Sequence, residues 1–154
     1  MRALILLGVL ASPVAAQELV FSPTATQTCL GLAADYTTKR ACVGMSARAC
    51  MEDTPGGYST VAMGGCFEAE LEFWDATLNA TYQSVLASAQ RAGPGEVEAL
   101  RNVQRAWIPF RDATCDYEYG QWGGGTGGGP AIISCLMRMT GEQALYLDFS
   151  RLGE

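Results

Sequence analysis

The sequence predicts an all-α protein, a small helical bundle stapled by disulfides. Two long stretches carry apolar residues at steps of three and four, the spacing that lines one face of an α-helix. No stretch shows the sustained alternation of apolar and polar residues that marks a half-buried strand. Glycine and proline runs separate the helical stretches. We therefore expect two long antiparallel helices with shorter helices packed across them.

The first sixteen residues have the composition of a secretory signal peptide. Arg2 supplies a positive charge, and residues 3–10 form an apolar segment too short to span a bilayer. Val14-Ala15-Ala16 form a small-residue cleavage site ahead of Gln17. We expect one domain over residues 17–154, without membrane insertion after cleavage, in the periplasm or secreted.

The mature chain is acidic. Without Arg2 it has nine basic and 16 acidic side chains, a net charge of −7, and it has no histidine. This balance argues against nucleic acid as a partner, because binding to phosphates needs a basic surface. A cationic protein is the partner that the charge favours.

All six cysteines follow the cleavage site, and an even number in an exported domain indicates three disulfides. Six cysteines can pair in fifteen ways. Sequence order and the helix breaks favour neighbours, namely Cys29–Cys42, Cys50–Cys66 and Cys115–Cys135. A zinc site is disfavoured because histidine and Cys-x2-Cys spacing are both lacking. No metal and no cofactor are predicted.

The first half of the chain predicts two short helices and one long one. The short helices are expected at about 24–34 and 39–52, followed by a turn at 53–58 that contains proline and glycine. Helical periodicity then continues for about thirty residues, from 60 to about 91. Gly64-Gly65 inside this helix predicts the close approach of a neighbouring helix.

A second long helix is expected from about Gly95 to Glu118, after the break at Gly93-Pro94-Gly95. Pro109 lies inside it and removes one backbone hydrogen bond, so a kink is expected there. Three aromatic side chains at helical spacing on the two long helices are expected in the core: Trp74, Trp107 and Phe110.

Seven of the eleven residues from Gly120 to Pro130 are glycine, which predicts a mobile loop. Cys115 and Cys135 are expected to hold its base, and Trp122 is its only large side chain. A last helix is predicted from Thr140, where Thr140-Gly141-Glu142-Gln143 has the spacing of a capping box, to about Arg151.

Several sequence blocks together resemble one bacterial envelope family. They are Cys50, TVAM at 60–63 with Cys66, DATLNATY at 75–82, QRAWIPFRDATC at 104–115, the glycine-rich segment, Cys135 and Thr140. Over about Cys50 to Leu147 the chain resembles the LprI-type lysozyme-inhibitor family. That family takes its name from a mycobacterial lipoprotein associated with lysozyme inhibition, and most of its bacterial members have no established role. The resemblance implies an exported protein that inhibits lysozyme-type hydrolases. This chain departs from the namesake in lacking a lipobox and in adding the segment that contains Cys29 and Cys42.

A polar set accompanies the apolar faces of the long helices. Asp75, Asn79 and Tyr82 share one helical face, and Gln104 and Arg111 border the apolar face of the other helix. These residues have the chemistry of a polar site. We favour a structural interpretation, in which an ion pair and hydrogen bonds between the two helices fix their register.

An enzymatic interpretation rests on the acids near the glycine-rich segment. Glycoside hydrolysis uses two carboxylates, and Asp112, Asp116 and Glu118 are the candidates. The chain has no histidine base, serine-nucleophile motif or phosphate-binding loop. We therefore predict a protein that is not an enzyme.

The favoured function is binding to a cationic lysozyme-type cell-wall hydrolase. Three residues in or near the glycine-rich segment are the predicted partner-binding set: Asp112, Glu118 and Trp122. Attraction between opposite charges would speed the encounter, and the tryptophan would fill a pocket of the partner. The alternative is a structural or stress-related envelope protein without a hydrolase target, and a carboxylate-dependent glycan hydrolase is less favoured.

Overall fold

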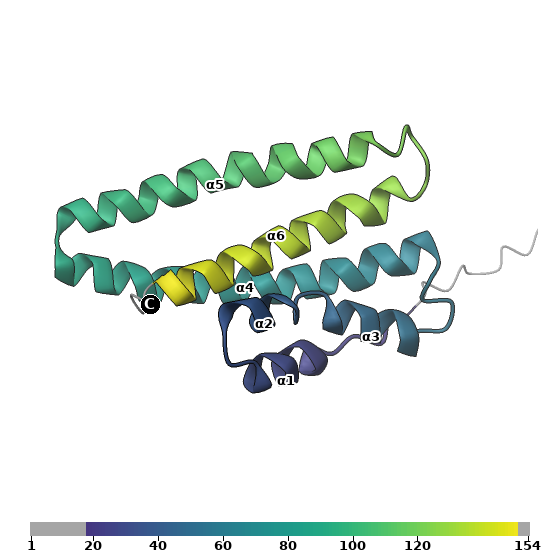
Figure 1. Cartoon of the computed structure of the whole chain (residues 1–154). Helices are drawn as coiled ribbons and strands as arrows, with labels where there is room; N and C mark the ends of the chain where they lie inside the picture. Colours follow the sequence, from purple (N-terminus) through teal and green to yellow (C-terminus); the bar gives the residue numbers. More distant parts are fainter. Residues whose placement is uncertain (1–17, 151–154) are drawn as a thin grey trace, which may run out of the picture.

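The structure, a computed structural model, describes residues 18–150, and the regular secondary structure within that range is entirely helical, without any strand (Figure 1). The helices are α1 (Thr24–Leu32), α2 (Tyr36–Arg40), α3 (Met45–Asp53), α4 (Thr60–Ala92), α5 (Pro94–Gly120) and α6 (Gly128–Ser150). The predicted signal peptide, residues 1–16, and the end of the predicted last helix at Arg151 lie outside the described residues. Within residues 18–150 no helix combines the length and apolar character needed to cross a bilayer.

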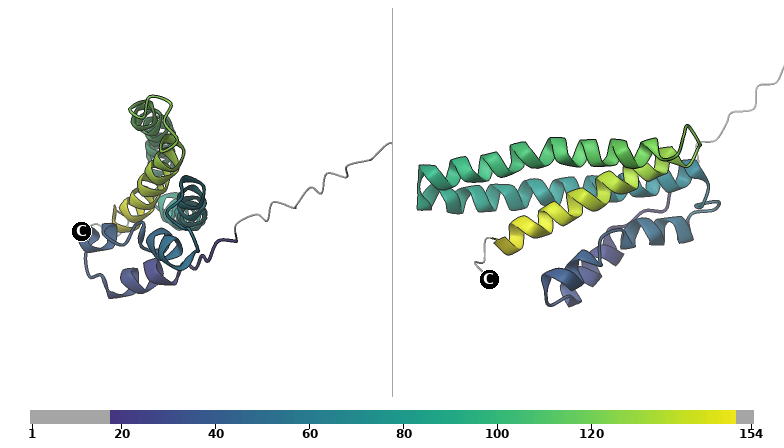
Figure 2. Two further views of the ribbon diagram at one scale, coloured as in Figure 1. Left: turned by 90° about the vertical axis from the view of Figure 1, so that its right-hand side faces the viewer. Right: turned by 45° about the horizontal axis from the view of Figure 1, so that its top comes forward.

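The three long helices form the body of the molecule. α4 and α5 run antiparallel, joined by a turn at Gly93, and α6 runs between them (Figure 1). Gly93 has a φ of +134°, which glycine adopts readily and other residues rarely do. The short helices α1–α3 lie on the side of α4 and α6 away from α5 (Figure 2). The predicted all-helical fold with two long antiparallel helices is therefore confirmed, and α5 lies at one edge of it.

The helix predicted at 39–52 is two helices in the structure. Gly44 separates them, because its φ of +91° belongs to the left-handed region that interrupts a right-handed helix. Asp35 begins α2 by accepting a hydrogen bond from the Thr38 backbone N–H at 2.9 Å, and this bond lowers the pKa of the Asp35 carboxyl. Arg40 at the end of α2 pairs with Glu142 of α6 at 2.8 Å, which raises the pKa of the guanidinium.

The predicted start of the last helix at Thr140 is wrong. α6 begins twelve residues earlier, at Gly128, and Thr140 is fully buried inside it. Gly141 has a packing role instead: a Cβ there would lie 3.0 Å from the Trp74 ring and 3.0 Å from Val43 Cγ1. The glycine lets α6 approach α4 closely without ending the helix.

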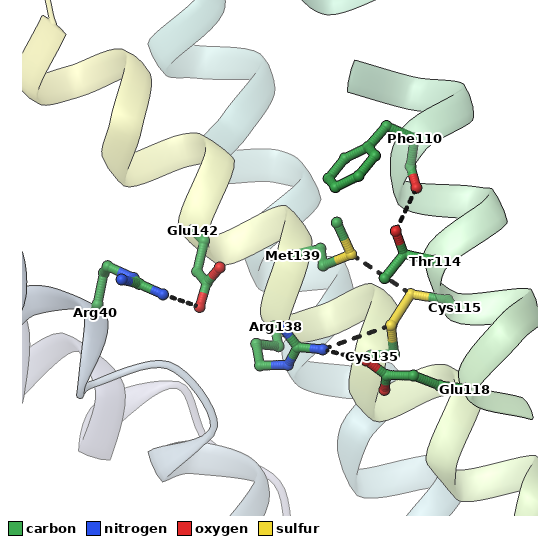
Figure 3. Close-up of polar contacts among 9 residues, drawn as sticks. All are labelled: Arg40, Phe110, Thr114, Cys115, Glu118, Cys135, Arg138, Met139 and Glu142. Carbon is green, nitrogen blue, oxygen red and sulfur yellow. Dashed lines mark hydrogen bonds and ion pairs between the residues drawn. A yellow bond between two sulfur atoms is a disulfide. The ribbon is translucent and has the colours of Figure 1, made fainter. Parts of the chain in front are cut away.

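The aromatic residues expected in the core divide into three cases. Trp74 is completely buried, as predicted, and Trp107 is half-buried against the core. Phe110 is 64% exposed, so its predicted core position is wrong. The reason is that Phe110 lies at the border of the side that α5 turns toward α6, where it lines an open hollow with Trp107 and Met139 (Figure 3).

A buried carboxylate joins the short helices to the body. Glu70 of α4 is fully buried, and its Oε1 accepts hydrogen bonds from Thr26 Oγ1 and the Gly44 backbone N–H, both at 2.8 Å. Oε1 also accepts from Trp74 Nε1 at 3.0 Å, and Oε2 accepts from the Ala47 backbone N–H at 2.6 Å. Two of these donors are the N-cap residue Gly44 and Ala47 in the first turn of α3, where backbone N–H groups lack helical partners and the helix dipole favours negative charge. Glu70 therefore caps α3 from another helix.

Three disulfides add covalent links between the same elements. Cys29–Cys42 ties α1 to the turn before α3, Cys50–Cys66 ties α3 to α4, and Cys115–Cys135 ties α5 to α6. Their Cα–Cα distances are 5.6, 5.7 and 5.5 Å, within the ordinary range for disulfides. These are the neighbour pairs that sequence order favours.

We predict that Glu70→Ala lowers the free energy of unfolding by about 3 kcal/mol or more, because the substitution leaves buried donors without an acceptor. Glu72→Ala is the matched control, since Glu72 is an exposed acid on the same helix, and its effect should stay within about 0.5 kcal/mol. Urea unfolding monitored by circular dichroism measures both. Equal stabilities for the two variants would contradict this role of Glu70.

We predict opposite effects for two glycines of α6. Gly141→Ala should destabilise the protein by about 1–3 kcal/mol, because its methyl group would press on the Trp74 ring. Gly129→Ala should be neutral or stabilise by up to about 1 kcal/mol, because a Cβ at Gly129 meets no atom within 4 Å. Thermal denaturation of both variants distinguishes a packing role from helix propensity. A Gly141→Ala variant as stable as the wild type would contradict the packing role.

Candidate functional site

The segment between α5 and α6, which we call the glycine loop (residues 121–127), is a chain of consecutive turns. The backbone N–H of Trp122 donates to the Tyr119 carbonyl at 3.1 Å, and that of Gly125 donates to the Trp122 carbonyl at 2.8 Å. Gly123 and Gly124 have φ values of +55° and +84°, which side chains rarely adopt. The predicted loop at 120–130 is thus shorter than expected, since Gly128 and Pro130 already belong to α6.

Two aromatic rings rest on glycine backbone at this loop. A Cβ at Gly127 would lie 2.3 Å from Trp122 Cζ3, and a Cβ at Gly128 would lie 2.9 Å from Tyr119 Cε2. Trp122 nevertheless stays 51% exposed and Tyr119 stays 48% exposed. Because these glycines lack a Cβ, both rings can pack directly on the backbone, and this packing positions them at the surface. Tyr119 was missed in the sequence, because its contact with Gly128 comes from the folding of the loop.

A disulfide and an ion pair close the base of the loop (Figure 3). Cys115 and Cys135 are both buried, and their bond joins the end of α5 to the first turns of α6. Glu118 accepts a hydrogen bond from Arg138 Nη2 at 2.8 Å across the same two helices (Figure 3). Because both side chains of this ion pair are more than 40% exposed, its contribution to stability is small, about 1 kcal/mol or less.

The three predicted partner-binding residues do not form one cluster. Asp112 and Glu118 lie roughly a third of a turn apart around α5, as helical geometry requires for residues six apart. Asp112 pairs with Arg111 at 2.8 Å, and Glu118 pairs with Arg138. Trp122 alone lies on the glycine loop. The loop end therefore presents aromatic rings, and Asp112 and Glu118 are each paired with an arginine.

The predicted polar set between the two long helices is also divided in the structure. Arg111 bonds to Asp112 and, at 3.4 Å, to Thr140 Oγ1, while Gln104 accepts from Gln143 Nε2 at 2.7 Å. Thr140 and Gln143 belong to α6, which runs between α4 and α5. The three residues of the set on α4 are therefore not joined to it: Asp75 and Asn79 are exposed, and Tyr82 packs against the core.

An open depression adjoins the glycine loop, with a volume of about 630 Å³. Its lining comes from the loop, from α4, from α6 and from the segment before α1, and apart from the acid Glu68 it is mostly small or apolar: Leu19, Gly64, Gly65, Thr126, Pro130 and Ile133. A Cβ at Gly64 would make an ordinary van der Waals contact with Ile133 Cδ1 of α6, at 3.6 Å, whereas a Cβ at Gly65 would lie 2.5 Å from Leu19 Cδ1. The tight contact at these two glycines is therefore with the segment before α1, and not with a neighbouring helix as expected. The loop end thus combines two exposed rings with a shallow apolar hollow.

These features define a small, disulfide-linked, all-helical protein that presents a structured aromatic loop at one end. The chain belongs to the LprI lysozyme-inhibitor family: residues 50–147 match the family model described as "Lysozyme inhibitor LprI". The match begins in α3 and includes α4, α5, the glycine loop and nearly all of α6, so α1 and α2 lie outside it.

Two similar proteins come from other bacteria. An uncharacterized protein of Rhizobium meliloti is 32% identical over 92 residues, which cover 53% of this chain and 66% of that protein, just under two thirds of its length. An uncharacterized 17.7 kDa protein in the puhA 5′ region of Rhodobacter capsulatus is 24% identical over 140 residues, which cover 84% of this chain and 86% of that protein. No solved structure matches the chain.

We predict that Gly127→Ala displaces the Trp122 ring, because the added methyl group would overlap it. Acrylamide quenching of tryptophan fluorescence should increase, since Trp74 is buried and Trp107 half-buried in both proteins. Gly129→Ala is the matched control, because a Cβ at Gly129 meets open space. Unchanged quenching in Gly127→Ala would contradict the packing of the Trp122 ring against Gly127.

Proposed function

We propose that this protein binds and inhibits a lysozyme-type cell-wall hydrolase outside the cytoplasm, in the periplasm or after secretion. The observation that carries the proposal is the family match, because it spans the glycine loop and the helices that hold it. Three disulfides are typical of proteins in oxidising compartments, which supports an extracytoplasmic location.

Charge supports a cationic target. The mature chain has a net charge of −7 after loss of Arg2, so a basic hydrolase is attracted to it over distances of about a Debye length, roughly 8–10 Å in ordinary salt. Such attraction speeds association more than it strengthens the complex. Affinity then depends on contacts that exclude water, and aromatic side chains supply these contacts most effectively.

The loop end is the surface that we assign to the target. Trp122 and Tyr119 offer rigid, half-exposed rings, and the adjoining depression can receive a partner side chain. Ordering a glycine-rich segment on binding costs backbone entropy. Here the turn hydrogen bonds and the Cys115–Cys135 link already restrict the segment, so most of that cost falls on folding.

We propose a role without catalysis. Glycoside hydrolysis requires two carboxyl groups that face one substrate bond. Of the three candidate acids, Asp112 and Glu118 lie on different sides of α5 and are each paired with an arginine, and Asp112 and Asp116 are both exposed on the helix surface. Their arrangement supports binding rather than bond cleavage.

The test is a cell-wall turbidity assay with the purified mature protein and several lysozyme types. We expect inhibition at micromolar excess, and a weakening of at least about tenfold in Trp122→Ala, because central aromatic residues dominate interface energy. Leu32→Ala is the control, since Leu32 is 83% exposed on α1, outside the matched region, and should inhibit like the wild type. If the wild type inhibits none of the lysozymes tested, the proposal is contradicted.

A further inference from the structure

The depression beside the glycine loop carries one charge, and that charge is negative. Among the described residues that line it, three have polar side chains: Thr60, Glu68 and Thr126. Each of them can accept a hydrogen bond, and no lysine or arginine from the described part of the chain lines the depression. The other lining residues are apolar or glycine. The depression is therefore an apolar surface with a single carboxylate.

Glu68, the acid in this lining, is unpaired. Within residues 18–150 its carboxylate has neither an ion pair nor a hydrogen bond, and the residue is exposed. The acids of α5 near the same end of the molecule differ, because Asp112 and Glu118 are each paired with an arginine. The charge of Glu68 thus remains available to a group from another molecule.

Helix geometry directs Glu68 over the floor of the depression. Side chains of an α-helix lean toward its amino terminus, so Glu68 extends over the turn that contains Gly64 and Gly65. Leu19 packs directly on Gly65, and Ile133 of α6 lies beside Gly64. The carboxylate therefore lies at the edge of a floor that two aliphatic side chains border.

We propose that the depression receives a lysine or arginine side chain of the hydrolase, an inference that rests on the proposed function. Both side chains combine an aliphatic stem with a cationic head. The stem packs against Leu19 and Ile133, and the head pairs with the carboxylate of Glu68. Hydrogen bonds between ionised groups are stronger than those between neutral groups, so this pairing selects a basic side chain over a neutral one.

The starts of two helices determine how the basic side chain lies. α4 and α6 both begin beside the depression, since Thr60 and Gly129 line it, and helix amino termini carry partial positive charge. This charge acts within the first turn, whereas Glu68 lies more than two turns into α4. The stem therefore lies over the helix starts, and the cationic head lies at Glu68, away from them.

The depression is continuous with the surface that carries the aromatic rings. Thr126 belongs both to the glycine loop and to the lining of the depression, and it follows Trp122 by four residues. One partner can therefore contact Trp122 and Glu68 together. Net charge attracts a basic partner over long range, whereas the pairing with Glu68 acts only in the complex. The two effects can be separated, because only the second depends on which acid is removed.

Inhibition by two matched variants separates these effects. Glu68→Gln and Glu72→Gln remove the same charge from exposed positions one turn apart on α4, but Glu72 does not line the depression. For a basic lysozyme we expect the inhibition constant to rise about three- to tenfold in Glu68→Gln and less than about twofold in Glu72→Gln. Circular dichroism verifies that both variants are folded. Equal inhibition by the two variants, with wild-type inhibition intact, would overturn this inference and leave the proposed function standing.

A lysine peptide tests the depression without a hydrolase. Isotope-labelled mature protein is titrated with acetylated trilysine amide and followed by two-dimensional NMR. We expect the amide signals of Gly64, Gly65 and Gly129 to shift, with an affinity at least about threefold weaker in Glu68→Gln than in Glu72→Gln. The same affinity in both variants, or shifts spread evenly over the acidic surface, would overturn the inference. The expected shifts together with a wild type that inhibits no lysozyme would contradict the proposed function and support the depression as a site for a basic side chain.

Discussion

The carboxylate of Glu70 is the interaction on which the arrangement of the short helices depends. It accepts hydrogen bonds from α1, from the first turn of α3 and from Trp74 on its own helix. The Trp74 ring in turn lies against Gly141 of α6. One buried acid and one buried ring therefore connect α1, α3, α4 and α6. Burying this acid is tolerable because four donors replace the water that it loses.

The same junction joins the part of the chain that matches the family model to the part that precedes the match. Glu70, Trp74 and Gly141 fall within the region that matches the LprI family, whereas Thr26 and Gly44 precede it. The helices α1 and α2 attach to the α4 and α6 side of this core, and Tyr36 of α2 lines a hollow together with Trp107 and Phe110 of α5. The glycine loop lies at the other end of α6 from this hollow.

Helix periodicity predicted α4 and α5 to within two residues at each end, because Gly93 breaks the chain between two strongly patterned segments. Glycine was misleading in α6. Gly128 and Gly141 look like helix breakers, yet both serve close packing against aromatic rings that only the tertiary fold supplies. Glu70 left a signal that was missed: a charged residue three after Phe67 and four before Trp74 interrupts an apolar stripe. At the candidate site, Trp122 could be identified from the sequence because it is the only large side chain among the glycines. The packing of Tyr119 on Gly128 could not be predicted, because it depends on how the loop folds.

The most direct test of the assigned binding surface is a two-dimensional NMR titration of isotope-labelled mature protein with a lysozyme that it inhibits. Amide signals of the glycine loop and of Tyr119 should shift or broaden with saturation, and those of α1 and α2 should remain in place. Perturbation confined to α1 and α2, with the glycine loop unchanged, would contradict a function located at the loop end.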